Sequence, residues 1–207
     1  EYCKRVAYPA MIRSPDWVSY TLKQPLMADP GAGMVYNSGC SHLLAAILQQ
    51  AAKMDVAVFA RTRLFEPLGI TAFQWERDPQ GMPIGGFGLY LTPRDMARFG
   101  QLYLQRGMWA GRRLISGEWV DRTTYPLHRT YEIGFYGRHW WVSSFHANRS
   151  EDDAEEWYYF ALGFGGQYIT VLPSRQTVVV LCNDRHKRDR EYVDYLRHFI
   201  IPALCGT

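Results

Sequence analysis

The spacing of apolar residues changes about two thirds of the way along the chain, and this change limits the folds available to it. Before residue 127, apolar residues recur every three or four positions in segments that begin at capping residues and end at Gly or Pro. The pattern predicts helices over 14–24, 38–54, 56–66 and 92–107, and a short helix that begins at Ser116. Ser14 and Asp55 are the predicted caps of the first and third helices. In the second helix we expect one apolar face, made of Leu43, Leu44, Ile47 and Leu48.

After residue 127 the chain is rich in aromatic and β-branched residues, in runs of strand length. These runs predict strands over 139–142, 156–161, 167–172 and 177–182. Residues 188–203 predict an amphipathic helix with Val193, Leu196 and Ile200 facing inward. Helices followed by antiparallel strands and a covering helix indicate an α+β fold, and we expect 1–127 and 128–207 to be two parts of one domain.

The composition is that of a globular protein with a sizeable core. The 207 residues are 47% hydrophobic and 15% aromatic, which favours a large buried interior or a cleft lined with aromatic side chains. The net charge of +3 is too small to indicate nucleic-acid binding. The basic cluster at 185–190 also contains Asp189, and we interpret it as the solvated start of a helix.

Cysteine and histidine spacing argues against a metal site. The four cysteines, Cys3, Cys40, Cys182 and Cys205, lack paired spacing, so we expect buried or unreactive free thiols. His42 lies on an apolar helix, which predicts a hydrogen-bonded core residue, whereas His139 and His146 could face a cleft. We expect no metal and no cofactor, because a zinc site needs three or four ligands. No apolar run approaches ~18 residues, so we expect no membrane span.

The segment Met34-Val35-Tyr36-Asn37-Ser38-Gly39 is the strongest functional signal in the sequence. It follows a predicted Pro30-Gly31 turn and opens the apolar helix that follows. A tyrosine two residues before a serine, at the start of a helix, is typical of a proton-transfer site. The alternative is that Tyr36 and Ser38 only shape the helix N-terminus, with Ser38 as its cap.

Three sequence blocks carry a resemblance to a known family. They are the segment just described with its helix, the LFEPLGI segment at 64–70, and the GLYLTPRDMARFG segment at 88–100. Together with Gly163-Phe164-Gly165-Gly166-Gln167, they resemble the serine β-lactamase and penicillin-binding-protein superfamily. The similar branch contains class C β-lactamases, D-alanyl-D-alanine carboxypeptidases, family VIII esterases and 6-aminohexanoate-dimer hydrolases. The Gly-Gly-Gln variant most resembles the last of these.

The resemblance implies a nucleophile that these residues do not encode. In the superfamily the nucleophile is the Ser of a Ser-x-x-Lys motif, whose Lys helps to deprotonate it. None of the nine serines here has a Lys three positions later. Two interpretations stay open. The sequence is the C-terminal part of a longer or clipped enzyme, with the nucleophile in an upstream segment, or it is a separate chain that has lost the nucleophile.

The resemblance also assigns roles to Tyr36 and Ser38. Tyr36 would accept or relay the proton of the missing serine. A free phenol has a pKa near ~10, so this role needs a nearby cation, which the motif Lys would supply. Ser38 would hydrogen-bond that Lys or the amide of the substrate.

A glycine-rich segment corresponds to the third motif of the superfamily, which is Lys/His-x-Gly on an edge strand. Gly165 and Gly166 would let the substrate approach the backbone, and the N–H of Gln167 would help to bind the oxyanion. No Lys or His is present, since Phe164 or Gly165 takes that place. The alternative is a tight turn between strands. Tyr90, after the Gly85-Gly86 loop, would line the pocket or pack as a core aromatic.

We therefore expect the C-terminal part of a β-lactamase-like serine hydrolase. Its substrate would be a small-molecule ester or amide, with β-lactams and D-Ala peptides less favoured because the basic residue of the third motif is missing. The expected partner is the upstream segment of the same protein. The sequence does not distinguish a bacterial cytoplasm from a periplasm. The alternative is a catalytically inactive, β-lactamase-like binding or scaffold protein.

Overall fold

A computed structural model describes residues 2–27, 29, 33–130, 133–146, 155–183 and 191–205. The chain divides into two compact units, Glu1–Thr92 and Pro93–Thr207. The predicted Pro30-Gly31 turn and the basic cluster at 185–190 lie outside the described residues. The boundary expected near residue 127 stays a prediction.

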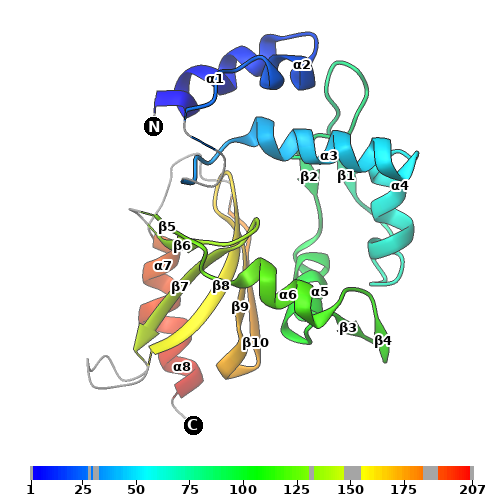
Figure 1. Ribbon diagram of the computed structural model, residues 1–207. Helices are drawn as coiled ribbons and strands as arrows, with labels where there is room; N and C mark the ends of the chain where they lie inside the picture. The colour runs from blue at the N-terminus through cyan, green and yellow to red at the C-terminus, as the bar shows by residue number, and fades with distance from the viewer. Residues whose placement is uncertain are drawn as a thin grey trace. The chain divides into compact units, whose positions relative to one another are not determined.

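The first unit consists of short helices and one small hairpin (Figure 1). In chain order its elements are α1 (Tyr2–Arg13), α2 (Trp17–Leu22), α3 (Ser38–Ala52), α4 (Val56–Ala60), the π-helical turn η1 (Arg61–Phe65), β1 (Gln74–Trp75) and β2 (Leu89–Tyr90). The two strands pair antiparallel, and the loop between them, residues 76–88, contacts the first turns of α3. The sequence pattern did not predict α1, which contains Pro9.

Helix caps in this unit correct two of the predictions. The cap of α2 is Asp16, whose Oδ1 accepts the Ser19 N–H at 2.8 Å, and not Ser14. The cap of α3 is Asn37, which accepts the Gly39 N–H at 2.8 Å. Ser38 is therefore the first helical residue, and its predicted alternative role as the cap is wrong. Asp55 caps α4 as predicted.

The buried stripe of α3 also differs from the predicted one. Gly39, His42 and Ala45 are buried, whereas Leu44 and Ile47 are 54% and 63% exposed. The small buried residues allow other segments to approach the helix axis closely, which an apolar-periodicity argument does not detect. The neighbouring core contains Met11, Trp17 and Ile84, with Tyr20 and Phe87 packed against them.

The second unit is built on a six-stranded antiparallel sheet. Its strands follow one another in the order β10-β9-β8-β7-β6-β5, so each pairs with its neighbour in sequence. They are β5 (His128–Thr130), β6 (Gly134–Tyr136), β7 (Trp141–His146), β8 (Glu155–Gly163), β9 (Gln167–Leu172) and β10 (Thr177–Leu181). The 3-10 turn η2 (Pro173–Arg175) joins the last two strands, at the predicted Pro-Ser-Arg turn.

Helices cover both faces of this sheet. Before it come α5 (Pro93–Leu104), the small hairpin β3 (Met108–Trp109) and β4 (Arg112–Arg113), and α6 (Gly117–Thr124); after it come α7 (Glu191–Tyr195), the π-helical turn η3 (Leu196–Ile200) and α8 (Ile201–Cys205). Figure 1 shows the α7–α8 segment against one face of the strands. On β8, Tyr158 and Phe160 pack in the cluster with Leu196, whereas Tyr159 packs in the cluster with Tyr103 of α5. Alternate side chains thus enter two separate cores.

This architecture confirms the α+β class with a covering C-terminal helix. The four predicted strands are present, with shifted ends: the first begins at Trp141, because His139 lies in a turn with φ of 66°. Leu196 is fully buried, as predicted. Within the described part of the chain, no single helix is long and apolar enough to cross a membrane. Helix α3 taken together with α4–η1 is long and apolar enough, but the two parts are bent by 78° relative to each other.

Candidate active site

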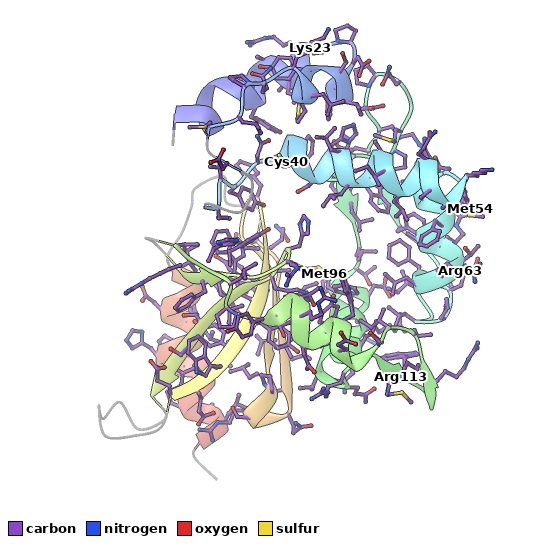
Figure 2. All side chains as sticks on the ribbon, viewed as in Figure 1. Lys23, Cys40, Met54, Arg63, Met96 and Arg113 are labelled. Carbon is purple, nitrogen blue, oxygen red and sulfur yellow. The ribbon has the colours of Figure 1, made fainter. Side chains whose placement is uncertain are left out.

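Tyr36 and Ser38 lie at the entrance to α3. Tyr36 lies just before the helix, in a segment without regular secondary structure. Asn37 caps the helix in an extended conformation, and Ser38 is its first residue; all three are partly buried. Figure 2 labels Cys40 near this end of α3 and Met54 just beyond its other end. The Asn37 side chain accepts the Gly39 N–H, and this hydrogen bond fixes the turn from Asn37 into the helix.

The Gly85-Gly86 pair contacts this first turn of α3. A Cβ atom at Gly86 would lie 2.8 Å from the Ser38 carbonyl oxygen and 2.9 Å from the Ser38 Cβ. A Cβ atom at Gly85 would lie 2.8 Å from the Ala45 Cβ. These distances are shorter than van der Waals contact, so two consecutive glycines are required where the loop crosses the helix. The structure thus brings Ser38 together with Gly86.

A buried pair, His42 and Asp78, joins the same helix to the same loop. His42 Nε2 lies 3.0 Å from Asp78 Oδ2, and both side chains are fully buried. The backbone N–H of Gly85 donates to His42 Nδ1 at 3.3 Å. The prediction that His42 is a hydrogen-bonded core residue is confirmed. Its partner was not predicted, because 36 residues separate the two in sequence.

Tyr90, a predicted substrate-binding residue, is an exposed side chain at the end of β2. It is 56% exposed, so it is not the packed core aromatic of the alternative interpretation. Its hydroxyl donates to Glu76 Oε1 at 2.5 Å, and this hydrogen bond raises the pKa of the Tyr90 phenol. Burial, together with the negative charge of Glu76, also raises the pKa of Tyr8. Both phenols therefore stay protonated at neutral pH and can act as hydrogen-bond donors.

An open cavity of about 400 Å³ lies beside Tyr90 within the first unit. Arg61, Phe73, Gln74 and Thr92 contribute to its lining. The Arg61 guanidinium lies 5.3 Å from the centre of the Phe73 ring, which places a cation over an aromatic face at the cavity wall.

The glycine segment of the second unit is a tight turn between β8 and β9. Gly163 pairs with Gln167, and residues 164–166 form the loop. Gly165 and Gly166 have φ of 81° and 86°, a left-handed conformation that favours glycine at both positions. Phe164 is 81% exposed at this loop. The turn interpretation is thus correct as a description of the backbone, and it leaves the proposed binding role open.

Two further features of this segment were not predicted. β9 lies between β8 and β10, so the expectation of an edge strand is wrong. The side-chain amide of Gln167 donates to the Asn183 carbonyl oxygen, and a Cβ atom at Gly166 would lie 3.1 Å from the Asn183 Cβ. Asn183 therefore supports the turn, although nothing in its local sequence indicates a role there.

The remaining candidate groups are cysteines and histidines. Within the described ranges, no three His, Cys, Asp or Glu side chains are grouped as metal ligands. Cys40 and Cys182 are exposed free thiols rather than buried ones, and partial burial raises the pKa of Cys182. Burial lowers the pKa of His139, which favours its neutral form. The His146 side chain lies outside the described residues.

The comparison with protein families decides the ancestry of the chain. A family model described as Beta-lactamase matches residues 4–200. The chain belongs to the beta-lactamase family. This confirms the resemblance inferred from Tyr36, the 64–70 segment and the 88–100 segment.

Solved structures of several other proteins show the same fold. A putative 6-aminohexanoate-dimer hydrolase from Bacillus anthracis matches with a TM-score of 0.73 and 22% identity, over 90% of this chain and 48% of the other. A beta-lactamase from Mycobacterium bovis matches with a TM-score of 0.62 and 20% identity, over 87% and 65%. Simvastatin synthase from Aspergillus terreus matches with a TM-score of 0.66 and 15% identity, over 89% and 57%. The chain thus spans between about half and two thirds of the length of these proteins.

Proposed function

We propose that this chain forms the C-terminal part of a serine hydrolase that cleaves ester or amide bonds through an acyl-serine intermediate. The nucleophilic Ser and its Lys would come from a segment outside these 207 residues. The observation that carries the proposal is the arrangement at the start of α3. Tyr36 directly precedes Asn37, the extended cap residue of α3, and Ser38 lies against Gly86 of the Gly85-Gly86 loop.

In the proposed reaction the serine hydroxyl attacks the substrate carbonyl carbon and gives its proton to Tyr36. The neighbouring Lys cation favours the phenolate form of Tyr36 that accepts this proton. The tetrahedral intermediate then collapses, and the leaving alcohol or amine takes the proton back from Tyr36. A water molecule attacks the acyl-serine by the same route and releases the acid.

The oxyanion of each tetrahedral intermediate would be bound by backbone N–H groups. In this proposal the Gln167 N–H is one donor and the nucleophile's own N–H is the other. Gly165 and Gly166 lack side chains at the turn, which supports close approach of a substrate to the backbone. The Gln167 side chain bonds to Asn183, so the turn is preorganised before substrate binds.

The substrate class follows from the side chains that replace the third motif. Phe164 or Gly165 takes the place of the basic residue that binds a carboxylate in the superfamily, and Phe164 is exposed. An apolar side chain favours small esters or linear amides over β-lactams and D-Ala peptides, which carry a carboxylate. Tyr90, with its hydroxyl directed to Glu76, is a second proposed substrate contact.

The proposal is tested with the complete polypeptide that contains this chain. Hydrolysis of p-nitrophenyl esters, nitrocefin and a D-Ala-D-Ala peptide should be compared, and we expect the esters to react fastest. Tyr36→Phe should lower kcat at least ~100-fold, because it removes the proton acceptor. A Tyr36→Phe variant with a near-normal kcat would exclude Tyr36 as the base, and nitrocefin hydrolysis without esterase activity would overturn the substrate ranking.

The second candidate function is a binding or scaffold protein with the same fold. It is favoured by one observation, the lack of Ser-x-x-Lys at all nine serines of the sequence. A fluorophosphonate probe separates the two, because it labels an activated serine whatever the substrate. Labelling of a serine in the complete polypeptide supports the hydrolase, and no labelling supports the scaffold.

A further inference from the structure

The His42–Asp78 pair is an unusual way to join a loop to a helix. Removing a carboxylate from water costs several kcal/mol, and a well-packed apolar pair can stabilise a core equally well. Both side chains are fully buried here. A buried polar pair at such a place is therefore better explained by the geometry that it imposes than by the stability that it adds.

The hydrogen bonds around the pair fix the tautomer of His42. Asp78 Oδ1 accepts the backbone N–H groups of Gln80 and Met82 at 2.9 and 2.8 Å, which holds the carboxylate within its own turn. Its other oxygen faces His42 Nε2. Because the Gly85 N–H donates to Nδ1, this nitrogen must carry a lone pair, so the proton lies on Nε2 and is donated to Asp78.

This chain of hydrogen bonds positions the loop over the first turn of α3. Asp78 orients the ring of His42, the ring accepts the Gly85 N–H, and the next residue, Gly86, lies against Ser38. Trp17 packs against His42, with the two ring centres 5.5 Å apart in an edge-to-face arrangement. The imidazole is thus held by an aromatic contact as well as at both nitrogens.

We propose that His42 and Asp78 are positioning residues for the reaction, which fix the Gly85-Gly86 loop against α3 and thereby the placement of Ser38 and the Tyr36 segment. This inference rests on the proposed function for its catalytic part. Its structural part, the Nε2–H tautomer and the fixed Gly85 N–H, is independent of activity and can be measured separately.

Asp78→Asn is the informative variant, because it keeps the size of the side chain. If the oxygen of the introduced amide stays on the two backbone N–H groups, the amide NH₂ group faces Nε2, and His42 must move its proton to Nδ1, opposite the Gly85 N–H. If the amide flips, its NH₂ group faces the N–H groups of Gln80 and Met82 instead. Either arrangement opposes two donors, so the loop loses its fixed position.

The matched control is Tyr192→Phe. It also removes one polar atom from a buried hydrogen bond, that between Tyr192 and Thr170 in the second unit, without changing ring packing. Both variants should lose some thermal stability. We expect only Asp78→Asn to lower kcat of the complete polypeptide, by about 10- to 100-fold with a smaller change in KM, because misplacement of about 1 Å has effects of that size.

Two measurements on the same proteins keep the outcomes distinct. Nitrogen-15 NMR of the wild-type His42 ring should show the Nε2–H tautomer, and the Gly85 amide should exchange with solvent at least ~10-fold faster in Asp78→Asn than in Tyr192→Phe. An Nδ1–H tautomer, or equal kcat and Gly85 exchange in the two variants, would overturn the positioning role. If Tyr36→Phe is fully active while the tautomer and exchange results hold, the proposed function fails and the structural connection stands.

Discussion

Phe160 and Phe164 lie four residues apart and offer a direct test of the sheet as the core of the second unit. Phe160 is 2% exposed in the cluster with Tyr158, Tyr168 and Leu196, whereas Phe164 is 81% exposed at the turn. Truncating a buried Phe to Ala costs about 3–5 kcal/mol, through lost burial and the cavity that is left. Truncating an exposed side chain changes stability by about 0.5 kcal/mol or less.

These free energies predict well-separated melting temperatures. For a chain of this size, about 1 kcal/mol shifts the midpoint by about 2–4 °C. Phe160→Ala should therefore melt roughly 6–20 °C below the wild type, and Phe164→Ala within about 2 °C of it, as measured by circular dichroism at one scan rate. Equal melting temperatures for the two variants would refute the placement of Phe160 between the sheet and the C-terminal helix. If Phe164 contacts the substrate as proposed, Phe164→Ala should instead raise KM for ester hydrolysis by the complete polypeptide.

Two further predictions concern the first unit. Gly86→Ala should slow ester hydrolysis about tenfold or more, because the added Cβ would lie 2.8 Å from the Ser38 carbonyl oxygen. The control variant Gly33→Ala should keep the wild-type rate, because no atom lies within 4 Å of its added Cβ. Equal rates for the two variants would contradict the close contact at Gly86. Asp55 has a lowered pKa, first because of its hydrogen bond from Arg77. Its contribution to stability is thus present above the ordinary Asp pKa of about 4 and lost as pH falls through the lowered value. Between pH 5 and 2, the free energy of unfolding in urea should fall by a smaller amount in Arg77→Gln than in the wild type. An equal fall in the two proteins would show that the Arg77–Asp55 ion pair does not contribute to stability.

Local sequence patterns predicted the second unit better than the first. Strands β8 and β9 were predictable because aromatic and β-branched residues on both faces enter cores, as Tyr159 and Phe160 do on opposite sides. The two-residue strands β1 and β2 are too short to show any periodicity. Helix α1 was missed because Pro9 lies inside it, and Pro is the residue least compatible with a helix interior.

The errors at helix starts have a common physical cause. Residues 14–16 and 37–38 each contain more than one residue that can cap, and the sequence does not say which side chain reaches the free N–H groups. In the structure the later candidate, Asp16, caps α2, and the earlier one, Asn37, caps α3. For the second case the difference matters, because it makes Ser38 a helical residue whose hydroxyl is not needed as the cap.

The site depends on contacts that no local pattern encodes. The sequence indicated a loop at the Gly85-Gly86 pair, but only the structure shows that this loop lies on Ser38 and is bonded to His42. His42 and Asp78 are separated by 36 residues, and each alone has an ordinary explanation, a core histidine and a turn aspartate. Their chemistry exists only in combination, since the carboxylate sets the imidazole tautomer and the tautomer accepts the loop N–H. A family match therefore predicts where Tyr36 lies in the chain, while the position of its helix relative to the loop is set by a pair that the motif does not include.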